Sequence, residues 1–157
     1  MKFKLILEKD YKGKLGHQPP SPDEYPDEIA RGDYIFDPSF GAPDDLFQHA
    51  YEYYLNTDLV SKADCRVFMD FLKKNQNKPN AEVTIYRGQP DSELDYGMWV
   101  TPFKSYAMAY AYDGAYAGEG SKVFQYKVKL HDLSCDFNSL AEWGYFGKPL
   151  KGKEIKS

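Results

Sequence analysis

The sequence predicts one α+β domain, for three reasons. Its 157 residues match the size of a single domain, which at this length buries roughly 70% of the surface of the unfolded chain. Apolar residues recur at helical spacing before Asn80 and alternate after it, with one helix inside the second half. No internal repeat or low-complexity tract interrupts this order, so a helical and irregular half precedes a mostly β half.

The first half divides into an irregular arm at 1–43 and a helical segment at 44–80. Residues 2–7 begin by alternating polar and apolar side chains and predict a short edge strand. Residues 13–43 hold six of the ten prolines, so we expect an irregular arm without regular structure. Six apolar side chains should pin the arm to the body: Tyr25, Ile29, Tyr34, Ile35, Phe36 and Phe40.

Two helices should follow the arm. The first begins near Pro43, Asp44 and Asp45, where acids favour a helix N-terminus, and it buries apolar residues at helical spacing. These are Phe47, Ala50, Tyr51, Tyr54 and Leu55. The second runs from Ser61, its N-cap, to about Asn75, with Cys65, Phe68, Met69 and Leu72 on one face.

The second half contains a β-rich core at 81–147 and a basic tail at 148–157. Strands are predicted at 82–88, 99–101 and 122–130, with shorter elements at 133–137 and 141–146. A helix rich in Tyr and Ala covers 105–113. The loop at 114–120 has three glycines in seven residues, so it should be mobile and lie near the site.

Composition excludes several classes of protein. A content of 42% hydrophobic and 28% charged residues is that of ordinary globular proteins, and 17% aromatic residues argue against disorder. No apolar run reaches the length of a membrane span, and charges at Lys2, Lys4 and Glu8 argue against a signal peptide. Cys65 and Cys135 lack metal-ligand spacing, so we expect reduced cytosolic thiols and no zinc site.

The three histidines (His17, His49 and His131) share no spacing typical of a metal site or a catalytic triad, so we expect structural roles.

Charge is distributed unevenly. The net charge of −4 argues against a general nucleic-acid binder. Residues 21–45 hold eight acids against the single base Arg31, and residues 148–157 hold four lysines against Glu154. This asymmetry predicts a solvated acidic face and a loose basic tail. The alternative is that the acidic stretch 23–45 docks a basic partner.

Three motifs in order carry a functional signal. Tyr86-Arg87-Gly88 ends the first core strand, and Thr101 ends a second strand before the helix with Ser105, Tyr106 and Tyr110. Glu142 follows the long alternating strand. In this order, residues 83–147 resemble the mono-ADP-ribosyltransferase superfamily, the fold of many bacterial toxins and phage effectors. The resemblance implies a split β-core with helices packed on one side and a cleft between Arg87 and Glu142.

The resemblance implies NAD as substrate and a role for each motif. Cleavage of the nicotinamide–ribose bond passes through an oxocarbenium-like state, which a fixed carboxylate, here Glu142, would stabilise. Arg87 would bind the phosphate and ribose side, because guanidinium is planar and always charged. Thr101 would support both as a hydroxyl. The remaining cofactor-binding residues would be Tyr86, Gly88 (beside the carboxamide), Ser105, and Tyr106 or Tyr110 stacked on nicotinamide.

Structural explanations exist for the same residues. Arg87 could be a surface arginine, Thr101 an ordinary strand residue, and Glu142 an exposed charge beside a buried indole. The two helix tyrosines, four residues apart, could simply pack in the core. Asp113 and Asp136 are the next carboxylates to consider after Glu142.

The expected activity is transfer of ADP-ribose from NAD to a protein or nucleic-acid acceptor, in the cytoplasm of the producing cell or of a targeted host cell. Leu140 stands where arginine-specific members carry a second acid, which argues against transfer to protein arginine. NAD hydrolysis is one alternative. The other is an inactive binding module or inhibitor that uses the acidic stretch.

Overall fold

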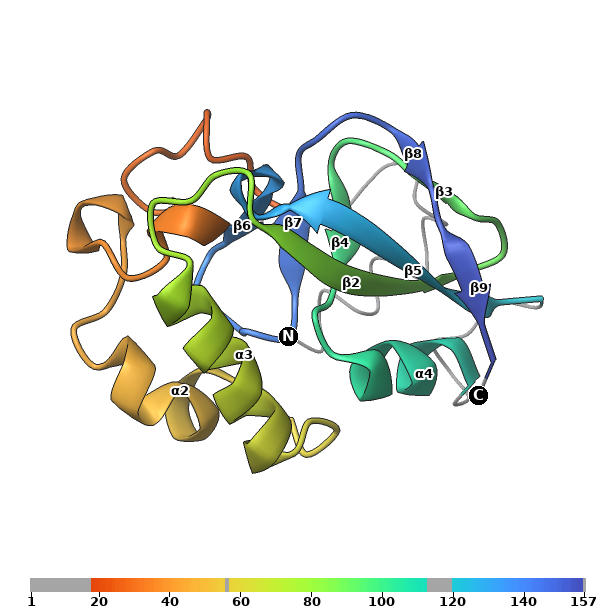
Figure 1. Cartoon of the computed structure of the whole chain (residues 1–157), viewed down its shortest axis with the longest axis horizontal. Coiled ribbons are helices and arrows are strands. Elements are labelled where there is room, and N and C mark those ends of the chain that lie inside the picture. Colours follow the sequence, from red (N-terminus) through yellow and green to blue (C-terminus); the bar gives the residue numbers. More distant parts are fainter. Residues whose placement is uncertain (1–17, 56, 113–119, 157) are drawn as a thin grey trace.

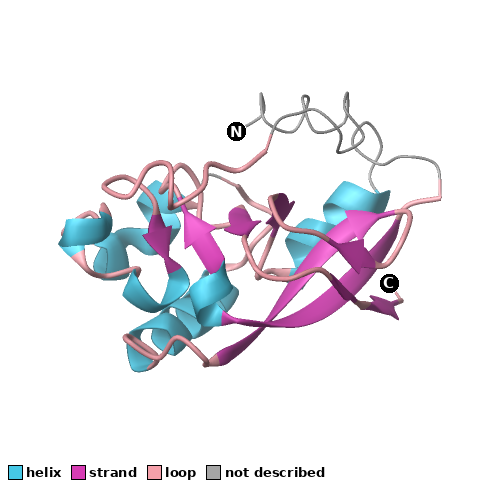
Figure 2. Cartoon of the chain, turned by 90° about the horizontal axis from the view of Figure 1, so that it is seen from above, coloured by secondary structure: helices cyan, strands magenta, loops and turns pink. Residues whose placement is uncertain are grey.

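The computed structural model describes residues 18–55, 57–112 and 120–156 (Figures 1 and 2). Within them, three α-helices accompany a four-stranded antiparallel sheet in the order β1-β6-β7-β4, a three-stranded sheet in the order β2-β5-β9 and a two-stranded sheet of β3 and β8. The predicted α+β class is therefore confirmed. The predicted strand at 2–7, His17, Asp113 and all of the glycine-rich loop except Gly120 lie outside the described residues.

Both helices of the first half form where predicted, as α2 (Leu46–Tyr54) and α3 (Lys62–Lys74). The side chain of Ser61 caps α3, because its Oγ accepts a hydrogen bond of 3.0 Å from the backbone N–H of Asp64. The predicted apolar face of α3 is the buried one: Cys65, Phe68, Met69 and Leu72. Local sequence signals therefore decide these two helices.

Two long strands form the middle of the fold. β2 (Glu82–Gln89) and β5 (Lys122–Lys129) pair along their whole length, from Glu82 opposite Lys129 to Gln89 opposite Lys122. The second sheet contains β4 (Met98–Val100), β6 (Leu133–Cys135) and β7 (Trp143–Tyr145). Glu142 was expected inside a strand, but it lies just before β7.

Helices cover both faces of the β2–β5 pair. Residues of α2 and α3 share the main core with one face, which includes Ile85 and Tyr126. The helix α4 (Lys104–Tyr112) packs Ala107 and Ala111 against Val123, on the alternate face. Figure 1 shows α4 apart from the α2 and α3 pair. The expectation of helices on one side is therefore wrong for α4.

The N-terminal arm contains regular structure that the sequence did not predict. β1 (Ala30–Arg31) pairs with β6, and the short 3₁₀ helices η1 (Gly32–Tyr34) and η2 (Pro38–Phe40) follow it. Backbone packing explains its close attachment, because a Cβ on Gly32 would lie 2.5 Å from the carbonyl oxygen of Leu130.

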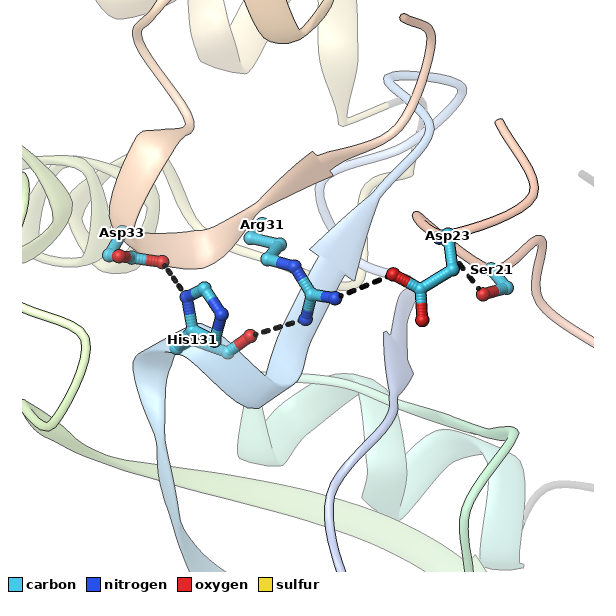
Figure 3. Close-up of polar contacts among 5 residues, drawn as sticks. All are labelled: Ser21, Asp23, Arg31, Asp33 and His131. Atoms are coloured by element: carbon cyan, nitrogen blue, oxygen red, sulfur yellow. Dashed lines mark hydrogen bonds and ion pairs between the residues drawn. The ribbon is translucent and has the colours of Figure 1, made fainter. Parts of the chain in front are cut away.

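Polar contacts also attach the arm to the body (Figure 3). The buried Asp33 places Oδ1 2.9 Å from Nδ1 of His131, a contact inside the fold that fits the structural role expected for this histidine. Arg31 donates to the carbonyl oxygen of His131 at 3.2 Å and to Asp23 Oδ1 at 3.1 Å. Part of the acidic stretch is therefore used inside the fold. Its exposed acids are Asp23, Glu24, Asp27, Glu28 and Asp44.

The basic C-terminal segment is not a loose tail. β8 (Leu150–Lys151) pairs with β3 (Glu93–Leu94), and β9 (Lys153–Ile155) pairs with residues 123–125 of β5. The lysines point outward while backbone groups complete two sheet edges, which charge composition alone does not reveal. In the described part of the chain, no helix is long and apolar enough to cross a membrane.

Removal of residues 150–157 should destabilise the protein and promote self-association. The deletion exposes an edge of β5 and removes the pairing of β8 with β3. Loss of the two pairings should lower the free energy of unfolding by about 2 kcal/mol. Urea unfolding and light scattering measure the two effects. A control that lacks only residues 156–157 retains β9 and should behave like the full chain. Equal stability of the two truncated chains would contradict the structural role of the segment.

Candidate active site

The predicted motifs meet where the two larger sheets join. Tyr86 donates its N–H to the carbonyl oxygen of Thr101 at 2.8 Å, and Thr101 donates to the carbonyl oxygen of Tyr86 at 3.0 Å. The antiparallel pairing of β4 with β7 ends at Val100 opposite Trp143. Thr101 follows Val100 and Glu142 precedes Trp143, so both lie at this end of the pair. The segment of Thr101 therefore lies between the segments that carry Arg87 and Glu142.

Arg87 is half-buried and held at two of its five N–H donors. Its Nε donates to Oε1 of Gln89 at 2.8 Å, and its Nη1 donates to the carbonyl oxygen of Trp99 at 2.6 Å. No ion pair joins it to a carboxylate within the described residues. Arg87 is thus not a free surface arginine, and its remaining donors could bind an anion.

Gln89 and Tyr126 orient Arg87 and were not singled out from the sequence. Gln89 donates from Nε2 to the hydroxyl of Tyr126 at 3.1 Å and to the carbonyl oxygen of Glu93 at 2.7 Å, which leaves its Oε1 for Arg87. Burial raises the pKa of Tyr126 to about 12, against the opposing effects of Gln89 and Arg87. The alternation of β2 puts Gln89 and Arg87 on one face, which is the only signal in the sequence.

Glu142 is a buried carboxylate, with 4% of its surface exposed. Its Oε2 accepts hydrogen bonds from the hydroxyl of Tyr106 at 2.7 Å and from that of Tyr110 at 3.4 Å. The alternative of an exposed charge beside a buried indole is therefore not met, although Trp143 is itself fully buried. A buried carboxylate requires such donors, because removal from water strongly disfavours the charged form.

Two predicted site residues, Thr101 and Ser105, form hydrogen bonds with backbone groups. Thr101 Oγ1 accepts from the N–H of Phe103 at 3.2 Å and forms no hydrogen bond with Arg87 or Glu142. Ser105 donates to the carbonyl oxygen of Leu59 at 2.7 Å. The Thr101 oxygen thus prepares the turn into α4, and the support expected from its hydroxyl stays a prediction.

Gly88 permits a close approach, but to α4. A Cβ at this position would lie 3.0 Å from the Cβ of Ala111 and 3.3 Å from the carbonyl oxygen of Ala107. Helix packing therefore explains this glycine, and contact with a carboxamide stays a prediction.

The other candidates within the described residues have contacts of their own. Asp136 accepts hydrogen bonds from the backbone and side chain of Asn138, in the turn after β6. Cys65 and Cys135 are buried thiols, and burial raises the pKa of Cys65 to about 11, which argues against a nucleophile. In the described ranges, no cluster of three His, Cys, Asp or Glu residues could hold a metal ion.

Comparisons with family models, with curated proteins and with solved structures find no match to this chain.

Gly88→Ala should lower the free energy of unfolding by about 1–3 kcal/mol, because the new methyl group overpacks β2 against α4. Urea unfolding measures this effect. The double variant with Ala111→Gly removes the nearest atom, so its destabilisation should be smaller than the sum of the two single changes. Additive effects would contradict the contact.

Tyr126→Phe should reduce the loss of stability at alkaline pH. The folded-state pKa of Tyr126, about 12, lies above the ordinary value of 10.0. The contribution of neutral Tyr126 to the free energy of unfolding is therefore fully present below pH 10. That contribution is lost as the pH rises toward 12. Unfolding free energies of both proteins at pH 8 to 11 test this, and parallel curves would contradict it.

Proposed function

We propose that the protein is an NAD-dependent mono-ADP-ribosyltransferase that modifies a macromolecular target. The observation that carries the proposal is that the segments of Arg87 and Glu142 both pair with the stretch from Met98 to Thr101: one brings a guanidinium with donors left over, the other a buried carboxylate. This is the charge arrangement that cleavage of a dinucleotide glycosidic bond requires. Its order along the chain is the one that the family resemblance implies.

Each group has a defined part in this reaction. Arg87 would hold the diphosphate by charge-assisted hydrogen bonds, since Gln89 and the Trp99 carbonyl already orient its guanidinium. Glu142 would stabilise the positive charge that develops on the ribose as nicotinamide leaves. The electron pair of the broken bond goes to nicotinamide, and a nucleophile of the acceptor then bonds to the ribose carbon.

The acceptor distinguishes transfer from hydrolysis. If water is the nucleophile, the same two residues make the protein an NAD glycohydrolase. Labelled NAD, incubated with a cell lysate, reports the outcome directly: label on protein, on nucleic acid or on free ADP-ribose. A toxin or phage-effector origin and action in the cytoplasm are part of the proposal and rest on the family resemblance.

The burial of Glu142 favours a second candidate, a module that does not cleave NAD. In that case the carboxylate only satisfies the hydroxyls of the buried Tyr106 and the half-buried Tyr110, and the exposed acids Asp23, Glu24, Asp27 and Glu28 dock a basic partner. Such a protein would bind a lysine-rich peptide in a salt-dependent manner and would leave NAD intact.

Glu142→Gln should keep NAD affinity within a few fold and lower turnover on the order of 10²–10⁴, because it removes a charge needed mainly in the transition state. The measurements are calorimetric NAD binding and release of nicotinamide. Asp70→Asn, on the exposed face of α3, is the matched control and should change neither. Full turnover in Glu142→Gln would exclude Glu142 as the catalytic carboxylate.

Arg87→Ala should instead weaken NAD binding by roughly 1.5–3 kcal/mol, since it removes charged hydrogen bonds that the bound ground state already uses. Arg66→Ala, an exposed arginine on α3, controls for net charge. All variants must first melt near the wild-type temperature. Unchanged affinity in Arg87→Ala would remove this residue from the NAD site.

A further inference from the structure

The contacts of α4 with Glu142 assign its tyrosines a role different from the stacking expected above. Tyr106 and Tyr110 lie four residues apart on one helix face, with ring centroids 5.0 Å apart and planes tilted by 37°. Both hydroxyls point to the same carboxylate oxygen, Oε2 of Glu142, at 2.7 and 3.4 Å. Two donors from one helix thus converge on one acceptor outside that helix.

We propose that Tyr106 and Tyr110 are positioning residues that fix the orientation of the Glu142 carboxylate and keep it ionised. The inference rests on the proposed function, and it defines how that site is prepared for catalysis.

Packing of α4 supports this role over stacking. The short side chains Ala107 and Ala111 let the helix approach β2 at Gly88, which directs the tyrosine row toward Glu142. Tyr106 is only 6% exposed and belongs to the main core, so its ring faces are covered by protein and not by solvent. A nicotinamide ring could stack on Tyr106 only after that core opened.

The chemistry of the contact explains what the hydroxyls do. Each O–H donates to a carboxylate and stabilises its charged form, because a protonated carboxyl accepts such a bond less well. A single fixed orientation also means that no side-chain entropy has to be lost when the carboxylate is placed for reaction. Glu142 would therefore act as a standing negative charge beside the ribose, and not as a proton donor to the leaving group.

Tyrosine-to-phenylalanine variants separate positioning from stacking, because phenylalanine keeps the ring and loses the hydroxyl. For Tyr106→Phe we expect unchanged NAD affinity, a fall in kcat of about 10- to 100-fold and an acid limb of the rate profile moved to higher pH. Tyr110→Phe should have a smaller effect, because its hydrogen bond is long. Tyr112→Phe, a 45% exposed tyrosine on the same helix, should resemble the wild type.

Stacking predicts the opposite result: wild-type kcat in Tyr106→Phe, with lost affinity only when the ring is removed in Tyr106→Leu. That result, or an unmoved acid limb, would overturn the inference.

The inference remains testable if the proposed function fails. If the wild-type protein neither binds nor cleaves NAD, the function is excluded, while unfolding of Tyr106→Phe, Glu142→Gln and the double variant still measures the coupling of the two side chains. We then expect strongly non-additive effects for this pair and additive effects for Tyr112→Phe with Glu142→Gln. Carbon-13 NMR of the Glu142 carboxyl should also show titration at higher pH in Tyr106→Phe. Additivity and an unmoved titration would overturn the inference.

Discussion

Two backbone hydrogen bonds between Tyr86 and Thr101 hold the candidate site together. They join the three-stranded sheet to the four-stranded sheet at the end of β4, just where the chain leaves the strand and turns into α4. Through this junction, Arg87 from one sheet comes close to Trp99 of the other, and its guanidinium bonds to that residue's backbone.

Three buried or half-buried charged groups are each held by hydrogen-bond partners, which are distant along the chain for Glu142 and Asp33 and nearer for Arg87. Glu142 takes hydroxyls from α4, Arg87 takes a side-chain amide and a backbone carbonyl, and Asp33 takes the imidazole of His131. Charged groups lose much free energy on leaving water, so such partners must be in place in the folded state. Burial of a charged group is costly in free energy and therefore rare. These three positions are for that reason the ones where a structural or functional role should be sought.

The helix α4 links packing to the chemistry of the site. Its alanines allow contact with the backbone of β2, and its tyrosines then reach the carboxylate before β7. The first turn of α4 also explains Thr101, whose oxygen accepts from Phe103. These contacts depend on one another. Gly88 and Thr101 fix the position of α4, and that position lets Tyr106 and Tyr110 reach the Glu142 carboxylate.

Local sequence determined the elements whose signals lie within a few residues: the apolar face and Ser61 cap of α3, the alternation of β2 and β5, and the order of the three motifs. Those signals arise from backbone geometry and short-range hydrogen bonds. Tertiary structure alone decided the pairing of β1 and β9, the partners of Arg87 and the burial of Glu142. These depend on segments brought together from far along the chain, such as Glu142 and Tyr106, 36 residues apart. Pairing between distant strands and the burial of a single polar side chain depend on which surfaces meet in the folded chain, so local residue type and spacing do not specify them.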